Sequence, residues 1–231
     1  LMKKISLVLL LACSAAFSQD PIKEERTSRL PDDIRSAFHR GDYRAALSMI
    51  REFRDLGILR PDLSEQVDFI DASCSARLGL ADTEKKLSGF LEAYPFSNNV
   101  NPARYELASH FHNNKNYTRA AAAYEQVEFA TLERELQLTG RFNWGYGLFS
   151  QKKLAESLVQ FNQVKLSEGS YGPAASYYAG FTEFSTGDNS NALTDLRRIE
   201  NQDSYSNIVP YLIANVLQRQ GKSEELLQYI T

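Results

Sequence analysis

The chain has 231 residues, of which 43% are hydrophobic and 24% charged, and this composition excludes a disordered chain. Its formal net charge is −3, so it lacks the basic balance that is typical of nucleic-acid-binding proteins. Beyond the first residues no apolar run is long enough to span a bilayer, and we expect no integral membrane segment in the mature chain.

Residues 1–19 predict a cleaved secretory signal peptide. Two lysines precede an apolar stretch from Ile5 to Ala12, and small residues follow it. Cleavage after the small-x-small site at residues 16–18 would release a chain that starts at Gln19. The alternative is a lipobox, because Leu-Leu-Ala directly precedes Cys13, and lipidation of that cysteine would anchor the protein to a membrane. Both alternatives predict an exported protein.

After the leader the sequence predicts a short linker at residues 20–30 and a helical repeat array over residues 31–231. Polar turns recur along this array, and an amphipathic helix follows each of them. Matching positions in the last four helices are 37, 35 and 34 residues apart. The interval from Ala46 to Ala120 is 74 residues, which accommodates one fainter copy between them. We therefore expect about six helix–turn–helix units. The positions that we aligned are Ala46, Ala120, Ser157, Ala192 and Leu226.

A second helix precedes each turn and carries a small residue 12 positions before the aligned one. A small residue there would let two antiparallel helices approach closely. Large apolar residues lie four and seven residues after the aligned position. This spacing is typical of the buried stripe of an amphipathic helix. The small residues are Ala108, Gly145, Gly180 and Ala214, and the stripe contains Tyr124, Val127, Phe161, Val164, Leu196 and Ile199.

This pattern resembles the tetratricopeptide repeat (TPR) over roughly residues 30–231. The resemblance is most specific at Gly41-Asp42-Tyr43, Asn116-Tyr117 and Gly187-Asp188, and it is weak between residues 60 and 100. It implies an all-α fold, a right-handed superhelical solenoid of antiparallel helix pairs. The last predicted helix reaches Thr231 without a stop signal or a polar capping helix, so we expect the array to be truncated there.

Little in the sequence predicts chemistry. We find no catalytic, cofactor-binding or metal-binding motif and expect neither an enzyme nor a cofactor. His110 and His112 would point in opposite directions on a helix, which makes them a poor metal site. Once Cys13 is removed or lipidated, Cys74 is the remaining cysteine, and its apolar helical surroundings predict a buried small hydrophobe.

The aromatic residues of the first helices predict a partner-binding face. In the TPR fold these helices line the concave face, and an aromatic residue lies three positions before each small residue. Further rings follow on the same helical stripe. They would either line a groove for a peptide or pack between successive helices, and the sequence leaves both alternatives open. The candidates are Tyr105, Phe142, Tyr146, Phe149, Tyr177, Phe181, Phe184 and Tyr211.

The leader and the style of the repeats resemble exported envelope TPR proteins of Bacteroidetes. This resemblance implies a non-enzymatic protein–protein interaction scaffold in the bacterial cell envelope, in the periplasm or tethered to the outer membrane. It implies a protein or peptide partner, and no nucleic acid. Two alternatives stay open: a lipoprotein subunit of an outer-membrane assembly or secretion machine, and an accessory repeat array of a longer multidomain protein.

Overall fold

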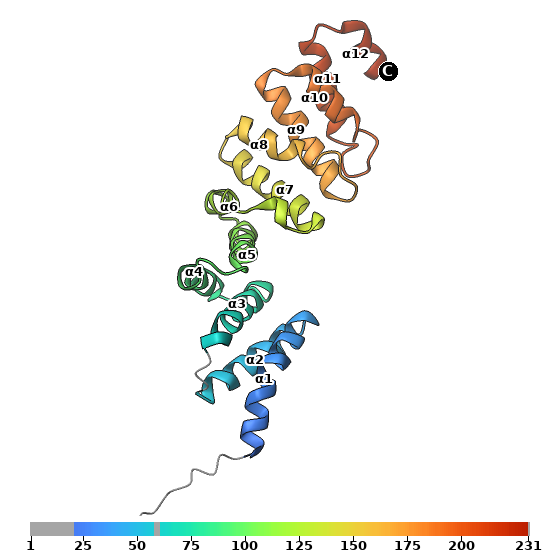
Figure 1. Cartoon of the computed structure of the whole chain (residues 1–231). Helices are drawn as coiled ribbons and strands as arrows, with labels where there is room; N and C mark the ends of the chain where they lie inside the picture. Colours follow the sequence, from blue (N-terminus) through green and yellow to red (C-terminus); the bar gives the residue numbers. More distant parts are fainter. Residues whose placement is uncertain (1–20, 58–60, 231) are drawn as a thin grey trace, which may run out of the picture.

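The computed structural model describes residues 21–57 and 61–230, and within these ranges all regular secondary structure is helical (Figure 1). The helices follow one another in a rising column, with neighbours in the chain lying side by side (Figure 1). They are α1 (Pro21–His39), α2 (Tyr43–Asp55), α3 (Pro61–Arg77), α4 (Thr83–Ala93), α5 (Val100–Asn113), α6 (Tyr117–Tyr124), the 3-10 helix η1 (Phe129–Thr131), α7 (Arg134–Ser150), α8 (Leu154–Asn162), α9 (Tyr171–Thr186), α10 (Asn189–Arg197), α11 (Val209–Arg219) and α12 (Ser223–Ile230).

The α-helices form six pairs, and the pairs stack in chain order. Each odd-numbered helix packs against its own even-numbered partner, against the even-numbered helix before it, and against the neighbouring odd-numbered helices. The odd-numbered helices therefore share one face of the stack, which we call the inner face, and the even-numbered helices form the outer face. This arrangement confirms the predicted all-α solenoid of about six repeats.

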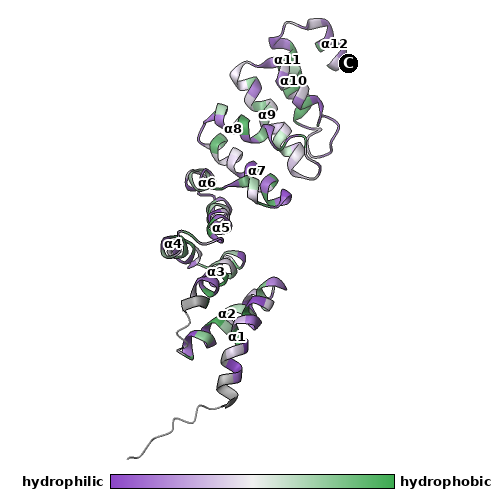
Figure 2. Ribbon diagram, in the orientation of Figure 1, coloured by the Kyte–Doolittle hydropathy of each residue, from purple (hydrophilic) through white to green (hydrophobic). Residues whose placement is uncertain are grey.

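The hydrophobic core is divided along the stack. The buried apolar residues fall into five clusters that follow the chain, and each cluster joins a helix pair to its neighbours. Figure 2 accordingly shows hydrophobic segments in every pair instead of one central mass. Since each repeat packs only against the adjacent ones, the stability of the array is a sum of local contributions.

Every odd-numbered helix ends in the same backbone conformation. At each of the six turns one residue has a positive φ, between 59° and 92°, and the next N–H donates to a carbonyl five residues earlier. These features define a Schellman-type C-cap, in which a left-handed residue lets the chain reverse. The second repeat, which is faint in the sequence, is placed by Gly79 and by the bond from Leu80 N to Ser75 O of 2.9 Å. The left-handed residues are Gly41, Gly79, Lys115, Lys152, Gly187 and Gly221.

Two of these turns carry a lysine where glycine is the relaxed choice, so Lys115→Gly and Lys152→Gly should each stabilise the protein. Relief of the left-handed strain is worth about 1 kcal/mol, and the added freedom of the unfolded chain removes part of it. We expect a net gain of about 0.5 kcal/mol each, measured by urea denaturation. Gly187→Ala is the matched control and should lose about 1 kcal/mol. A loss of stability in both lysine variants would contradict the assignment of strain.

Small residues allow the close helix contacts that the repeat pattern predicted. A Cβ atom added at Gly145 would lie 2.8 Å from Phe161 Cε1, and one added at Gly180 would lie 2.8 Å from Leu196 Cγ. Both distances are shorter than a van der Waals contact, so the expectation is confirmed at these two positions. The large partners, Phe161 and Leu196, are fully buried.

The first helix begins before the expected boundary of the array at residue 31. α1 starts at Pro21 and runs through Pro31, so most of segment 20–30, which we expected to be a linker, is helical. Tertiary contacts account for this extension, because Leu30 is fully buried and Arg26 bonds Glu52 of α2 at 2.8 and 2.9 Å. They offset the backbone hydrogen bond that a proline removes inside a helix.

The predicted leader, including its cleavage site and Cys13, lies outside the described residues. Among the helices that are described, none combines the length and the apolar character needed to cross a membrane. Cys74 is fully buried, as predicted, and burial raises the pKa of its thiol to about 12. A thiol in this state is a packing residue and not a nucleophile.

Candidate partner-binding face

All eight aromatic residues predicted to bind a partner lie on odd-numbered helices. α5 carries one of them, α7 and α9 carry three each, and α11 carries one. The structure therefore brings them to the inner-face helices, but their exposure differs. Tyr105 is only 8% exposed and belongs to a core cluster, whereas Tyr211 is 79% exposed. The other six are half-buried, namely Phe142, Tyr146, Phe149, Tyr177, Phe181 and Phe184.

The half-buried rings form a ladder between α7 and α9. Tyr146 and Phe149 contact Tyr178 with ring centroids 5.4 and 5.2 Å apart, and Phe149 also contacts Phe181 at 5.8 Å. Tyr146 extends the ladder to Tyr117 of α6, at 5.1 Å. These edge-to-face contacts hold neighbouring repeats together. The ladder is thus part of the packing, and its rings are only partly exposed.

Tyr178 is the centre of this ladder, although the sequence did not single it out. Its ring touches five others and stacks on Phe161 at 5.4 Å with an interplanar angle of 18°. Burial raises the pKa of its hydroxyl to about 12. In the sequence Tyr178 directly follows Tyr177, but only Tyr177 lies at the aromatic position of the repeat pattern, so the pattern does not select Tyr178. The five ring partners of Tyr178 are Phe142, Tyr146, Phe149, Phe161 and Tyr177.

The remaining predicted rings also have partners inside the protein, except for Tyr211. Tyr177 stacks on Tyr205 at 5.7 Å, and Arg219 covers the ring of Phe184 at 3.9 Å in a cation–π contact. No ring contact holds the side chain of Tyr211 within residues 21–57 and 61–230, so this ring is the most accessible of the eight.

The N-terminal half of the inner face contains an open groove of about 520 Å³. Its lining comes from α1, α3, α5, the start of α7 and the turns beside them, so it lies entirely on the inner-face side. Apolar walls are provided by Phe38, Phe69 and Leu136, among others. The sequence did not predict this groove, because four helices contribute to it and the repeat pattern is weakest in this part of the chain.

One ion pair lies in the groove, between Arg77 of α3 and Glu106 of α5. Arg77 Nη2 lies 3.3 Å from Glu106 Oε1, and its Nη1 donates to the hydroxyl of Tyr43 at 3.3 Å. The side chain of Glu106 is 13% exposed, and its Oε2 atom is buried without a hydrogen-bond partner. Burial raises the pKa of this carboxyl, and nearby Ser73 and Arg77 counteract that effect only in part.

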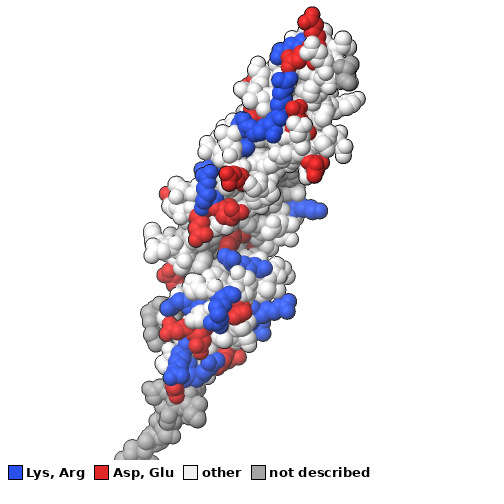
Figure 3. Space-filling model, turned by 90° about the vertical axis from the view of Figure 1, so that its right-hand side faces the viewer, with Lys and Arg blue, Asp and Glu red and all other residues white. Residues whose placement is uncertain are grey.

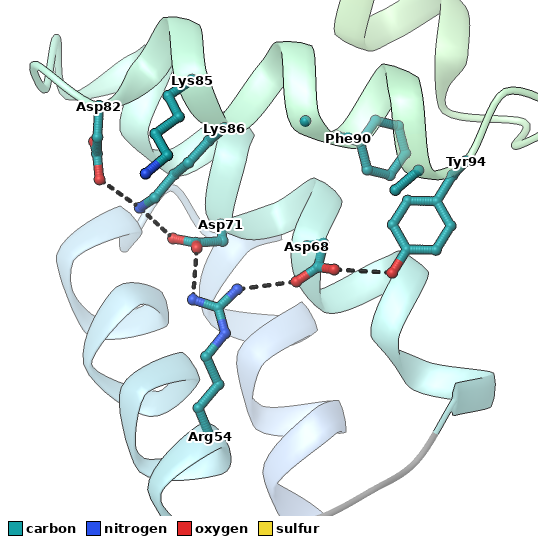
Figure 4. A pocket seen from close by; sticks show the side chains of 10 residues that line it. Arg54, Asp68, Asp71, Asp82, Lys85, Lys86, Phe90 and Tyr94 are labelled. Atoms are coloured by element: carbon teal, nitrogen blue, oxygen red, sulfur yellow. Dashed lines mark hydrogen bonds and ion pairs between the residues drawn. The ribbon is translucent and has the colours of Figure 1, made fainter.

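A polar pocket of about 330 Å³ lies on the opposite side of the stack, where α2, α3 and α4 meet (Figure 4). Asp71 accepts from Arg54 at 2.8 Å and from Lys86 at 2.7 Å, and Lys86 also pairs with Asp82 at 2.9 Å. The second nitrogen of Arg54 bonds Asp68 at 2.9 Å. Because all three carboxylates are paired, this network joins the first two repeats and leaves none of the three free for a ligand.

A second buried charge cluster lies between the repeats of α8, α9 and α10. Lys165 Nζ lies 2.6 Å from Asp195 Oδ2 and 3.7 Å from Glu183 Oε1, and both carboxyl side chains are 3% exposed. Lys165 therefore faces two buried acids, and Arg198 Nη2 also lies 3.9 Å from Asp195 Oδ1. Burial and the charge of Asp195 raise the pKa of Glu183 to about 7, against the influence of Lys165.

On the side shown in Figure 3, acidic and basic side chains intermingle over most of the stack, and basic side chains follow one another in a short strip towards its upper end, with acidic ones beside them. Among the residues that the structure describes, no three histidine, cysteine or acidic side chains are grouped to hold a metal ion.

Solved structures with the same arrangement of helix pairs decide the fold. The structure of MamA AMB-1 matches with a TM-score of 0.62 and 16% identity, covering 78% of this chain and 93% of that one. The fold is a TPR-type solenoid. A Podospora anserina putative kinesin light chain with nearly identical TPR-like repeats matches with a TM-score of 0.52 and 15% identity, covering 77% of this chain and 97% of that one. No family model matches the sequence, and no curated protein matches it significantly. At these identities the likeness to TPR-type structures concerns the fold.

Proposed function

We propose that this TPR-type solenoid is a non-enzymatic interaction scaffold that binds a segment of a partner protein on its inner face. The observation that carries the proposal is the groove of about 520 Å³. It has apolar walls, and within the described residues it is open to the surroundings. Its volume lies within the range of about 300–1,000 Å³ that is usual for ligand sites. The fold supports the proposal, because stacked helix pairs present a stiff extended surface.

The groove is a better binding centre than the aromatic ladder that the sequence favoured. Tyr146, Phe149 and Phe181 are half-buried, and each already contacts at least one other ring of the protein. A partner that follows the inner face from the groove towards α11 would contact their outer edges and then the exposed ring of Tyr211. We therefore expect the groove to supply most of the binding free energy and the aromatic residues to supply a smaller part.

A site-specific crosslinking experiment tests this proposal. A photoreactive benzoylphenylalanine replaces Leu136, which is 38% exposed in the groove, or Val159, which is 57% exposed on the outer-face helix α8. After irradiation of the protein in its native host, we expect a defined polypeptide adduct from position 136 and none from position 159. Adducts of the same polypeptide from both positions, or from position 159 alone, would contradict binding on the inner face.

We also propose that the protein acts in the cell envelope after export. The charged start, the short apolar stretch and the small residues of the leader support this location. Cleavage before Gln19 would give a periplasmic protein, and lipidation of Cys13 would tether it to the outer membrane as a lipoprotein. Mass spectrometry of the N-terminal peptide from the native host separates the two, and an intact leader would exclude both.

A further inference from the structure

The groove contains a buried acid whose hydrogen-bonding capacity is only partly used. The side chain of Glu106 projects from the middle of α5 among apolar groove walls, and its Oε2 atom has no partner. An ionised carboxylate accepts several hydrogen bonds, and a buried oxygen without one costs free energy. The hydroxyl of Ser73 lies near this carboxyl and lowers its pKa in part, but Ser73 Oγ and Glu106 Oε2 are both buried without a hydrogen bond of good geometry, so the capacity of Glu106 is only partly used in the unbound protein.

Arg77 does not compensate this acid well. It contacts Glu106 through one bond of 3.3 Å, which is long for a charge-assisted pair. The guanidinium is shared with the Tyr43 hydroxyl and lies near the rings of Phe38 and Tyr43, at 5.7 and 5.5 Å. Its side chain is 48% exposed. Arg77 is thus held by contacts on the side of α1 and α2 as well as by Glu106, and its charge is not committed to Glu106 alone.

Other charges in the groove do not satisfy Glu106 either. Besides Arg77 the lining contains one basic side chain, His110, whose ring nitrogens lie 3.3 and 3.4 Å from Asn114 Nδ2. By contrast, Glu84 and Arg119, the comparable inter-repeat pair on the outer face, form two bonds of 2.7 and 3.0 Å. The contrast shows that a glutamate–arginine pair of this fold can be fully formed, and that the pair in the groove is not.

The rest of the groove fits a side chain with an apolar stem and a cationic end. Phe69, Leu132 and Leu136 offer apolar surface for methylene groups, and Glu106 offers the counter-charge. Lysine and arginine combine these two properties, because they bury their stems along apolar surface and keep a charged head. An acidic side chain would add a second negative charge beside Glu106, and a purely aliphatic one would leave its oxygen unpaired.

Resting on the scaffold function proposed above, we propose that the groove recognises a partner segment that inserts an arginine or lysine side chain, with Glu106 as its counter-charge. The inserted cation displaces Arg77 or joins it at the carboxylate. Glu106 thereby sets the specificity of the groove, while the apolar walls contribute affinity that does not depend on charge.

Oriented peptide libraries test this inference over many partner sequences at once. Blocked dodecapeptides carry a fixed central arginine, citrulline, norleucine or glutamate between degenerate positions, and the immobilised protein selects among the pools. Citrulline has the shape of arginine without its charge. We expect the wild-type protein to retain the arginine pool at least about tenfold over the citrulline pool. In Glu106→Gln this preference should fall to within about twofold, with apolar selection at the flanking positions unchanged.

The control variant is Glu84→Gln, which breaks an inter-repeat ion pair outside the groove and should leave the arginine preference intact. Equal retention of arginine and citrulline by the wild type, or preference for glutamate, would overturn the inference while apolar selection still supports a peptide-binding groove. Absence of selection at every position in the wild-type protein would overturn the scaffold proposal as well. An arginine preference that persists in Glu106→Gln would assign the recognition to another group.

Discussion

Replacing Glu183 by glutamine should stabilise the protein by about 2–3 kcal/mol at pH 8.5 and change its stability little near pH 4.5. The pKa of Glu183 is raised from 4.5 to about 7, so the folded protein binds the proton more tightly than the unfolded chain. Stability therefore falls as the pH rises through this window, by about 1.4 kcal/mol for each unit. Glutamine keeps the shape of the side chain and removes the negative charge that is repelled by the charge of Asp195.

Urea denaturation followed by circular dichroism at several pH values between 4.5 and 9 measures this effect. Glu156→Gln is the control, because this glutamate is 62% exposed and 4.0 Å from its nearest cation, Lys153. We expect its pH profile to match that of the wild type. Parallel profiles for Glu183→Gln and the wild type would show that Glu183 is ionised in the folded protein without cost.

Among the substitutions that we propose, truncating Tyr178, the central ring of the aromatic ladder, should lower the stability of the protein most. We expect Tyr178→Ala to lower the free energy of unfolding by about 3–5 kcal/mol, because it leaves a cavity among five neighbouring rings. Tyr178→Phe keeps these ring contacts and should lose only about 1 kcal/mol. Tyr211→Ala removes a ring that is 79% exposed and should change stability by no more than about 0.5 kcal/mol.

Urea denaturation of the three tyrosine variants separates packing from binding. If Tyr178→Ala kept the stability of the wild type and lost partner binding instead, the ladder would be a recognition surface. For the same reason we expect Tyr146→Ala together with Phe181→Ala to destabilise the array, since each ring contacts a neighbouring helix.

The repeat architecture was predictable because its signals are local. A left-handed turn residue, a small residue before it and an apolar stripe after it lie within about twenty positions of one another, so Gly180, Gly187 and Leu196 specify one repeat on their own. The start of α1 was not predictable in this way. It depends on Leu30 and Arg26 meeting other helices, and Pro31 suggests a boundary when it is read locally.

The candidate site was predictable only in part. Spacings of three and four residues place Tyr146 and Phe149 on one stripe of a helix, but they do not show whether the next helix covers that stripe. The structure shows that Tyr178 covers it. The N-terminal groove has no sequence signature, because residues from four helices must be brought together before its walls exist.

Neighbouring repeats differ in how far exposed charge pairs contribute to their contact, and this affects how the groove responds to solution conditions. The first two repeats are linked by the network of Arg54, Asp71 and Lys86 in addition to ring contacts such as that of Phe38 with Phe69, whereas α7 and α9 are linked by aromatic rings. Dissolved salt screens charges that are partly exposed, and it does not weaken contacts between rings. Rising ionic strength would therefore weaken the contact between the first two repeats, which carry one end of the groove, more than the contact between α7 and α9.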